Sequence, residues 1–403
     1  MKKLIPFLCV FAYFASPYRI AGHELPAVIC IISLVLALLS KPIVSIDKKY
    51  LTYMIYMWVV PLVCAILCSI PGDYMTAAIP VALILTSCYL FILLPTADKN
   101  LVLKYYRLLV YIAVGFFIVQ EISFYLFSYR PTLYLSFLEM YYEDSDAVSF
   151  SASRAGMERS SSFFLEPSHF VQYIMPYYCI LLSKFLETRK NLLEVLAFTS
   201  VIIFIRSGVG LVVLLVLFCF FFMKSNYLKL YQRVLILVFG LASILLVTVL
   251  FTDTELVSSL MGRSSEITSL EVEAHGAQSG FIRIWRGYFI YGAMDTINQI
   301  FGVSIACIEH VCNAVYIPGV RYDGGYMNGI QSLLVTGGII GFLLFFRYLF
   351  GLAKRLDITG KSILVAMIAL FFMEQMLNTD KMFLYILLAS CFVKNNIVQS
   401  YSK

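Results

Sequence analysis

A glutamate, a histidine and a tyrosine lie on one face of a helix that is predicted to begin at Pro167. Proline fits the first turn of a helix, because the amide hydrogen that it lacks has no helical partner there. Glu166, His169 and Tyr173 are spaced i, i+3 and i+7, so they share a face. A carboxylate next to an imidazole at a helix start suits general-base catalysis. Glu166 and His169 are therefore the candidate catalytic residues.

The same residues have a structural alternative. Glu166 would then cap the helix, where the helix dipole favours a negative charge. His169 would lie in a membrane interface, and Tyr173 would join an aromatic belt. For His169 alone this alternative is the stronger interpretation. For Glu166 the catalytic interpretation is preferred, because Arg159 lies just upstream.

Two arginines, Arg283 and Arg286, stand three residues apart at the start of an amphipathic stretch that extends to Ile300. A cation at a helix start opposes the helix dipole unless an anion is bound there. Helix N–H groups and two guanidinium groups together would make a strong diphosphate site. The alternative is that both side chains snorkel from an interfacial helix. In either case we expect both arginines to face solvent.

The composition predicts an integral membrane protein. Of 403 residues, 61% are hydrophobic and 13% are charged, and the mean hydropathy is +0.86. Such a chain has too little polar surface for a soluble protein of this length. We expect a single transmembrane domain over residues 1–403, with about twelve helices at roughly 4–18, 25–40, 51–70, 74–94, 106–128, 168–186, 191–206, 207–223, 231–251, 328–350, 361–377 and 381–393.

The basic residues predict the orientation. With both termini in the cytoplasm, 20 of the 30 cations fall on the inner side, and 15 of those 20 are lysine. Nine of the ten outer cations are arginine. Because arginine binds phosphate and carboxylate with a planar fork, the outer side is expected to recognise anions. Two large extracytoplasmic loops are expected, at 129–167 and 252–327.

Other features are weaker. Glu121 and Glu374 fall toward the outer ends of their spans, where intramembrane acids are functional candidates. Gly337 and Gly341 favour a close helix contact. Whether Cys307 and Cys312 form a disulfide is left open. The sequence has no metal-ligand spacing, nucleotide-binding loop or nucleic-acid motif, so no cofactor, metal or nucleic-acid partner is expected.

Four segments resemble the Wzy class of bacterial surface-polysaccharide repeat-unit polymerases, which are related to the O-antigen ligases. RSSSFFLEPSHFVQY, at 159–173, resembles the Arg…Phe-x-Glu-Pro-Ser-x-Phe-x-x-Tyr signature. The others are IRSGVGLVVLLVLF (205–218), SGFIRIWRGYFIYGAM…FGVSI (279–305) and GGYMNGIQSLLVTGGIIGFLLFF (324–346). The resemblance implies a GT-C-like, all-α polytopic membrane fold in the bacterial inner membrane. It also implies diphosphate binding by four arginines, Arg159, Arg206, Arg283 and Arg286.

Two features depart from the family pattern. The paired Arg-x10-Gly pattern of some polymerases is missing from the outer-loop arginines. In the ligases a histidine precedes the Asn of the last motif, whereas here the residue is Met327. The catalytic base therefore does not transfer from the ligases.

The expected function is polymerisation of lipid-linked oligosaccharide repeats. The growing glycan would move from polyprenyl diphosphate to a sugar hydroxyl of another repeat, at the outer face of the membrane. The partners would be the lipid-linked oligosaccharide, membrane lipid, and a chain-length regulator and flippase. The alternatives are an O-antigen ligase, which uses the same donor, and a lipid-linked oligosaccharide flippase, which would need charges deep in the spans. A membrane acyltransferase would be expected to have a histidine near the cytoplasmic side. It is disfavoured because all four histidines are expected outside.

Overall fold

The computed structural model describes residues 3–40, 42–73, 86–131, 138–140, 160–224, 282–317 and 327–394. It is mostly helical, at 76%. The helices of the first half are α1 (Leu4–Phe14), α2 (Leu25–Leu39), α3 (Lys48–Leu67), the π-turn η1 (Tyr89–Leu93), α5 (Leu94–Thr96), α6 (Lys99–Phe127), α8 (Pro167–Thr188), α9 (Leu192–Phe204) and α10 (Gly208–Lys224). Those of the second half are η2 (Ile282–Arg286), α14 (Gly287–Ala293), α15 (Thr296–Phe301), η3 (Ile305–Cys307), α16 (Ile308–Ala314), α17 (Gly329–Arg355), α18 (Ile358–Phe371) and α19 (Asp380–Ser390).

Three of these helices, α3, α6 and α17, are long and apolar enough to cross a membrane. Six shorter apolar helices accompany them among the described residues. Ten of the twelve expected spans coincide with described helices. Of the span expected at 74–94 the structure describes only 86–94, and the span expected at 231–251 lies outside the described residues. The structure is thus compatible with a helical membrane protein, while the number of crossings stays a prediction.

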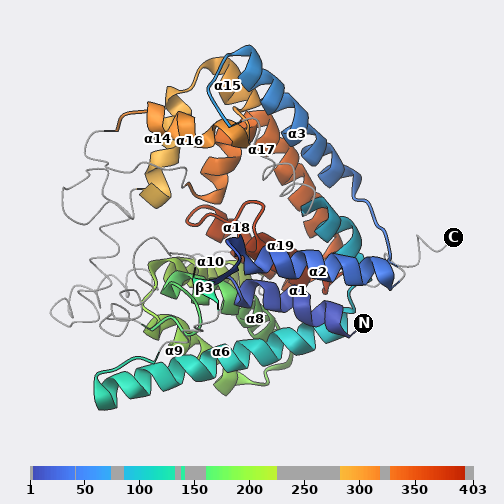
Figure 1. Ribbon diagram of the computed structural model, residues 1–403. Helices are drawn as coiled ribbons and strands as arrows, with labels where there is room; N and C mark the ends of the chain where they lie inside the picture. The colour runs from blue at the N-terminus through green and yellow to red at the C-terminus, as the bar shows by residue number, and fades with distance from the viewer. Residues whose placement is uncertain are drawn as a thin grey trace.

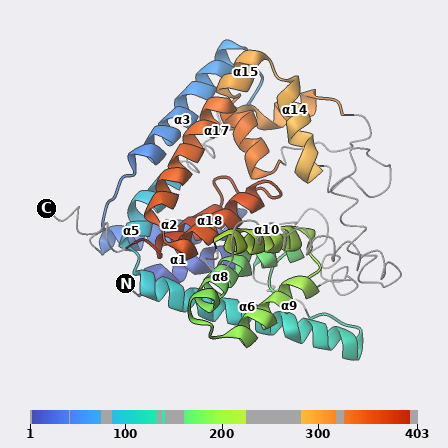
Figure 2. The ribbon, with the colours of Figure 1, turned by 180° about the vertical axis from the view of Figure 1, so that it is seen from behind.

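The helices form two groups (Figure 1). In one group α3 and α17 lie side by side, with α14, α15 and α16 against them, and Figure 2 shows the same pairing from behind. In the other, α1 packs on α2 and α6, and α18 packs on α8, α10 and α19. A continuous apolar core joins the two groups, because buried side chains of α3 and α17 belong to the same cluster as those of α1, α8 and α19.

The ends of several helices come together at two places in the molecule, and we name each place after one residue that lies there. At the Arg355 end, Arg355 pairs with Asp47, and Leu356 forms a β-bridge with Val393. At the Glu374 end, the N–H of Gly329 donates to the carbonyl of Glu374 over 2.9 Å. The Arg355 end gathers residues expected inside the cell, and the Glu374 end gathers residues expected outside.

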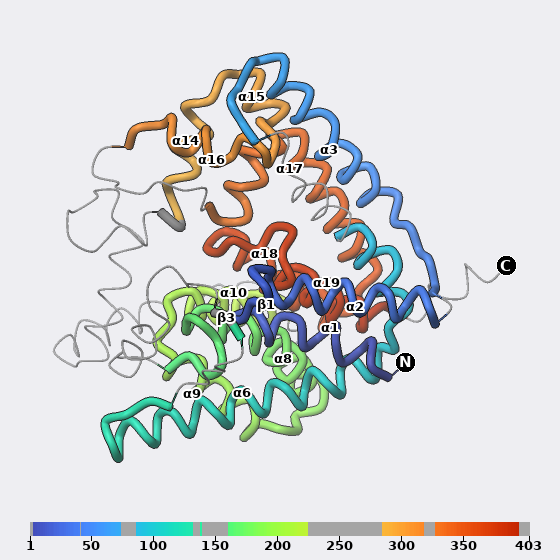
Figure 3. The backbone as a smooth tube through the Cα atoms, in the orientation of Figure 1, coloured from blue at the N-terminus to red at the C-terminus, as the bar shows by residue number. Residues whose placement is uncertain are grey.

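Helix α17 is interrupted at Gly338, where φ is +64°. This left-handed conformation is open to glycine and costs other residues free energy. Carbonyl groups left free at the break are satisfied from outside the helix. The N–H groups of Val303 and Ser304 donate to Val335 and Thr336 over 3.0 and 3.2 Å, and the hydroxyl of Tyr56 donates to Gly337 over 3.0 Å. Figure 3 follows the backbone where α15 meets α17.

Close glycine packing between α17 and α3 is confirmed. A Cβ on Gly337 would lie 2.6 Å from the sulfur of Met57, and a Cβ on Gly341 would lie 3.2 Å from the same atom. Small residues at these positions let the two helix backbones approach, which is how helices associate in a membrane.

The expectation of a purely helical chain is wrong in one detail. A small antiparallel sheet has the order β2-β1-β3, with β1 (Tyr18–Ile20) at its centre, β2 (His23–Glu24) and β3 (Glu139–Met140). Alternation over so few residues leaves too little periodic signal for a sequence-based prediction. The sheet joins the turn between α1 and α2 to the first large loop.

Candidate functional site

Helix α8 begins at Pro167, as the sequence predicts, and Glu166 occupies the N-cap position. Its carboxylate does not cap the helix, because no backbone N–H donates to it. Oε2 of Glu166 instead accepts a hydrogen bond from the Ser168 hydroxyl over 3.1 Å. The Glu166 side chain is half-buried at the Glu374 end, which suits a carboxylate that must reach a ligand.

The face of α8 that continues from Glu166 is directed at α1. Tyr13 donates its hydroxyl hydrogen to the backbone carbonyl of His169 over 2.8 Å. The ring of Tyr173 lies 5.4 Å from that of Tyr13 and is fully buried, so Tyr173 does not belong to a lipid-facing belt. Neighbouring Gln172 is also fully buried, and its Nε2 has no hydrogen-bond partner among the described residues.

Two acidic residues interact with Tyr13, one from the segment between α18 and α19 and one from the first position of α19. Tyr13 interacts electrostatically with both Asp380 and Glu374. Burial raises the pKa of Asp380 to about 6, and Glu24 adds to this, while Lys381 opposes it. Oδ2 of Asp380 has no hydrogen-bond partner in the described part of the chain. The sequence analysis missed Asp380, because a Thr-Asp pair at a helix start is equally typical of a simple cap.

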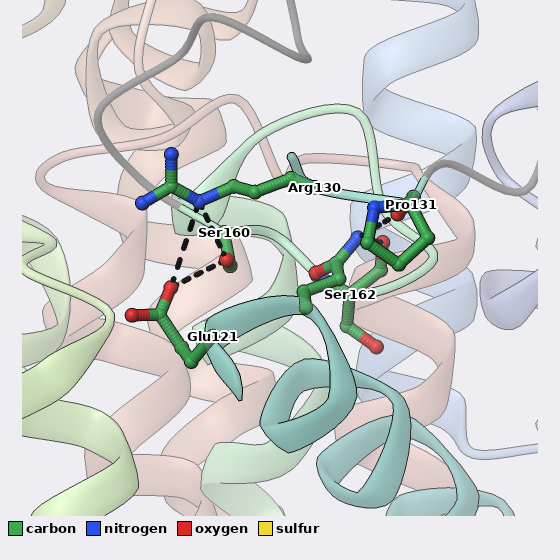
Figure 4. Close-up of polar contacts among 6 residues, drawn as sticks. Glu121, Arg130, Pro131, Ser160 and Ser162 are labelled. Carbon is green, nitrogen blue, oxygen red and sulfur yellow. Dashed lines mark hydrogen bonds and ion pairs between the residues drawn. The ribbon is translucent and has the colours of Figure 1, made fainter. Parts of the chain in front are cut away.

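Charged and hydroxyl groups interact at the C-terminal end of α6 (Figure 4). Nε of Arg130 lies 3.7 Å from Oε1 of Glu121 and donates to the hydroxyl of Ser160 over 3.0 Å. Gln120 bonds to both backbone groups of Ser162, over 3.1 Å and 2.8 Å. These bonds hold the segment that leads into Glu166. Glu121, expected as a functional acid, is thus engaged with Arg130.

Arg206 occupies the turn between α9 and α10, as the sequence predicts, with a left-handed φ of +53°. Gly210 packs against Val171 near the start of α8, so Arg206 and Glu166 lie at the same end of their helices. Arg206 also acts electrostatically on Arg130. Burial, the largest cause, and the charge of Arg206 lower the pKa of Arg130, while Glu121 opposes them.

The expectation that Arg283 and Arg286 both face solvent is wrong for Arg286, which is buried. Its side chain is 2% exposed, and its guanidinium donates to the carbonyl of Cys312 over 3.5 Å. The helix that follows, α14, has only seven residues. In the amphipathic stretch that follows, Phe289 and Ile297 are exposed. Arg159 and the side chain of Arg283 lie outside the described residues.

A buried amide pair starts α17 next to this segment. Asn328 and Gln331 form a capping box: the N–H of Gln331 donates to Oδ1 of Asn328 over 2.9 Å. Nδ2 of Asn328 donates to the carbonyl of Phe372 over 2.8 Å, and Nε2 of Gln331 donates to that of Ile284 over 2.7 Å. Sequence reasoning missed this box, although Asn followed three residues later by Gln is its signal.

The two ends of the molecule hold their cations differently. Among described side chains, thirteen of the fifteen cations expected inside are exposed. None of the five expected outside is exposed: Arg130 and Arg286 are buried, and Arg19, Arg206 and Lys381 are half-buried. Buried cations need anionic or hydrogen-bonding partners. The arginines expected outside are therefore part of built polar sites.

Cys307 and Cys312 are both buried and both free thiols. Burial raises the pKa of Cys312 to about 11, which Arg286 opposes. Within the described ranges, no three His, Cys, Asp or Glu side chains are grouped closely enough to hold a metal ion.

Comparison with known proteins finds no matching family model, no similar curated protein and no similar solved structure.

Proposed function

We propose that the protein polymerises lipid-linked oligosaccharide repeats at the outer face of the bacterial inner membrane. The observation that carries the proposal is the burial of the cations at the Glu374 end, against the exposure of those at the Arg355 end. A polyprenyl diphosphate donor is an anion that must be held at one membrane surface. Half-buried Arg206 can reach such a ligand, whereas Arg130 and Arg286 are bonded to protein groups and shape the site around it.

In the proposed reaction, the bond from the anomeric carbon of the growing glycan to the diphosphate oxygen breaks. A glycosidic bond forms to a hydroxyl oxygen of the acceptor repeat, whose proton passes to a base. Glu166 is the proposed base, because its half-buried carboxylate lies at the same end as Arg206. His169 is placed one turn further along α8, where it would orient the acceptor.

Arg206 is the proposed diphosphate ligand among the described residues, with Arg159 and Arg283 as further candidates. Guanidinium bonds that strengthen as negative charge develops on the leaving diphosphate would lower the barrier. Arg286 is enclosed beside Cys312, so its proposed role is to position the segment that carries Arg283.

The proposed topology has both termini in the cytoplasm, about twelve spans of a GT-C-like domain, and loops 129–167 and 252–327 outside. Contacts at the Arg355 end join only residues expected inside, which supports placing these helix ends on one side of the membrane. Cysteine labelling in a Cys-free background tests it with Tyr129→Cys and Lys190→Cys, both at exposed positions. An impermeant reagent should label position 129 in intact cells and position 190 only after the membrane is opened. The reverse pattern would reject the topology.

The function is tested first in the cell. Deleting the gene should reduce a surface-glycan ladder to a single-repeat band, with the repeat still exported. Loss of a ligase would leave polymer on the lipid carrier, and an unchanged ladder would reject the proposal.

A flippase is the second candidate, because the interrupted helix α17 is of the kind that transporters use. Its deletion would trap the repeat inside the cell.

The site is tested with purified enzyme and a lipid-linked repeat. Arg206→Lys keeps the charge but loses the fork, so the rate should fall roughly 30- to 1,000-fold, or about 2–4 kcal/mol. Arg189→Lys is the matched control, because Arg189 also has a left-handed φ, of +59°, but is exposed at the other end of α8. Glu166→Gln should abolish turnover, whereas Glu187→Gln, on the same helix, should not. If Arg206→Lys turned over as fast as Arg189→Lys, and Glu166→Gln as fast as Glu187→Gln, the proposed site would be wrong.

A further inference from the structure

A cavity of about 360 Å³ lies at the Arg355 end, far along the helices from Glu166. Its walls come from the start of α3, from η1 and α5, and from the ends of α17 and α19. Most of the lining is apolar: Leu90, Phe91, Leu94, Leu352, Ile386 and Val393. Figure 2 shows α5 next to the neighbouring ends of α3 and α17.

Polar groups lie on the lining of this cavity where the helices end. Lys99 is the first residue of α6, Arg355 the last of α17, and Asp47 the N-cap of α3. Arg355 pairs with Asp47, and its side chain is 42% exposed. The lining carries two cations and one acid, a net charge of +1. Lys48 and Lys354 lie on the same helix ends, and so do Asp98 beside Lys99 and Asp357 beside Arg355, so the net charge stays positive.

The segment before α3 lies along the cavity with apolar side chains turned outward. Ile43, Val44 and Ile46 are exposed at 60, 60 and 56%. The N–H of Ser45 donates to the carbonyl of Phe91 over 2.9 Å, so the segment is fixed to η1. Apolar side chains at this exposure suit contact with hydrocarbon rather than with water.

The wall itself has two unusual features. Tyr50 is fully buried, and its hydroxyl has no hydrogen-bond partner in the described chain. The turn η1 is a π-helix of five residues, and such turns are frequent at functional sites. Ordinary packing between helices explains neither the Tyr50 hydroxyl without a partner nor the π-helical turn, whereas a wall shaped around a ligand explains both.

We propose that this cavity binds one anionic phospholipid of the leaflet at the Arg355 end. An acyl chain would lie along Leu90, Leu94 and Leu352, and the phosphate would lie between Lys99 and Arg355. Net positive charge beside an apolar cavity matches this ligand, because each basic residue near a membrane surface adds about 1 kcal/mol to the binding of anionic lipid. The proposal requires a membrane protein but not a polymerase.

The test uses the full-length protein in bilayers of phosphatidylcholine with phosphatidylglycerol, and bromine-labelled lipids that quench tryptophan. Trp58→Phe and Trp285→Phe remove the two native tryptophans. Phe91→Trp then reports on the cavity, and Leu108→Trp, at an exposed position on α6, reports on ordinary lipid. At position 91, brominated phosphatidylglycerol should bind roughly five-fold more tightly than brominated phosphatidylcholine for each cation involved. At position 108 the two lipids should quench about equally.

Three further outcomes decide the proposal. Lys99→Gln should remove most of the preference at position 91, whereas Lys104→Gln, exposed one turn along the same helix, should not. Leu352→Phe, which fills the cavity, should reduce quenching by both lipids at position 91. Equal preference at positions 91 and 108 would show only general charge attraction and would overturn the proposal. Displacement of the brominated lipid by inorganic phosphate alone would show a free-anion site and would also overturn it.

Discussion

At the Arg355 end, Lys99 and Lys354 extend into solvent, whereas at the Glu374 end Arg130 and Arg286 are enclosed by protein. Exposed lysines suffice to orient helices and attract lipid headgroups, and they contribute little to stability. An enclosed guanidinium has lost its water and depends on fixed partners such as Ser160 and the carbonyl of Cys312. The two ends therefore differ in how their cations are held: mostly in solvent at the Arg355 end, and against fixed protein groups at the Glu374 end.

Removing a buried arginine should give the largest effect. Arg286→Ala empties a packed position and leaves the carbonyl of Cys312 without this donor, so unfolding should become easier by about 2–4 kcal/mol. Arg347→Ala, an exposed arginine on α17, should change stability by less than about 0.5 kcal/mol. Thermal unfolding in detergent measures both. Equal losses would remove the contrast between the two ends.

The helix caps sharpen the same contrast. Asn328→Ala loses two buried hydrogen bonds, to Gln331 and Phe372, and should cost about 2–3 kcal/mol. Asp98→Ala removes an exposed cap from α6 and should cost about 1 kcal/mol. A chemical-denaturation series on the two variants compares them directly. A greater loss for Asp98→Ala would contradict the view that the Glu374 end is the more tightly built.

Replacing Asp380 should stabilise the protein, unlike the substitutions above, and the gain should depend on pH. Its folded pKa of about 6 lies above the ordinary value of 3.8, so the fold favours the protonated form. Wild-type stability should therefore decrease as pH rises from about 4 to about 6. Asp380→Asn imitates the protonated acid and should stabilise the protein by about 1–3 kcal/mol at pH 7, with no gain below pH 4. Melting temperatures across this range test it, and a destabilised variant at pH 7 would refute it.

The smallest effect is expected at the Arg355–Asp47 pair. Both side chains are partly exposed, at 42 and 23%, so solvent screens their attraction. Arg355→Gln should cost about 0.2–1 kcal/mol in low salt and almost nothing in high salt. Melting temperatures at two salt concentrations measure this. A salt-independent loss above about 2 kcal/mol would make the Arg355 end as specialised as the other.

The sequence predicts helix positions well where apolar runs are long and capped. Pro167 marks the start of α8, and the Gly337 and Gly341 pair indicates a close helix contact, because both signals are local. The partner helix, α3, is known only from the structure. Arg286 was misjudged because its burial depends on α16, which lies 22 or more residues further along the chain. The break at Gly338 was missed for the same reason, since a glycine pair in an apolar run is equally compatible with a continuous helix.

The interruption of α17 has a consequence for how the chain is made. Residues 302–304, which contact the interruption and donate hydrogen bonds to its carbonyl groups, precede both halves of α17 in the sequence. They are therefore synthesised first. A ribosome releasing Gly338 therefore delivers it to a segment that already exists, and the free carbonyls need not wait for later sequence. In a membrane, where an unmatched carbonyl is costly, this order lets the interruption at Gly338 form as the helix is inserted.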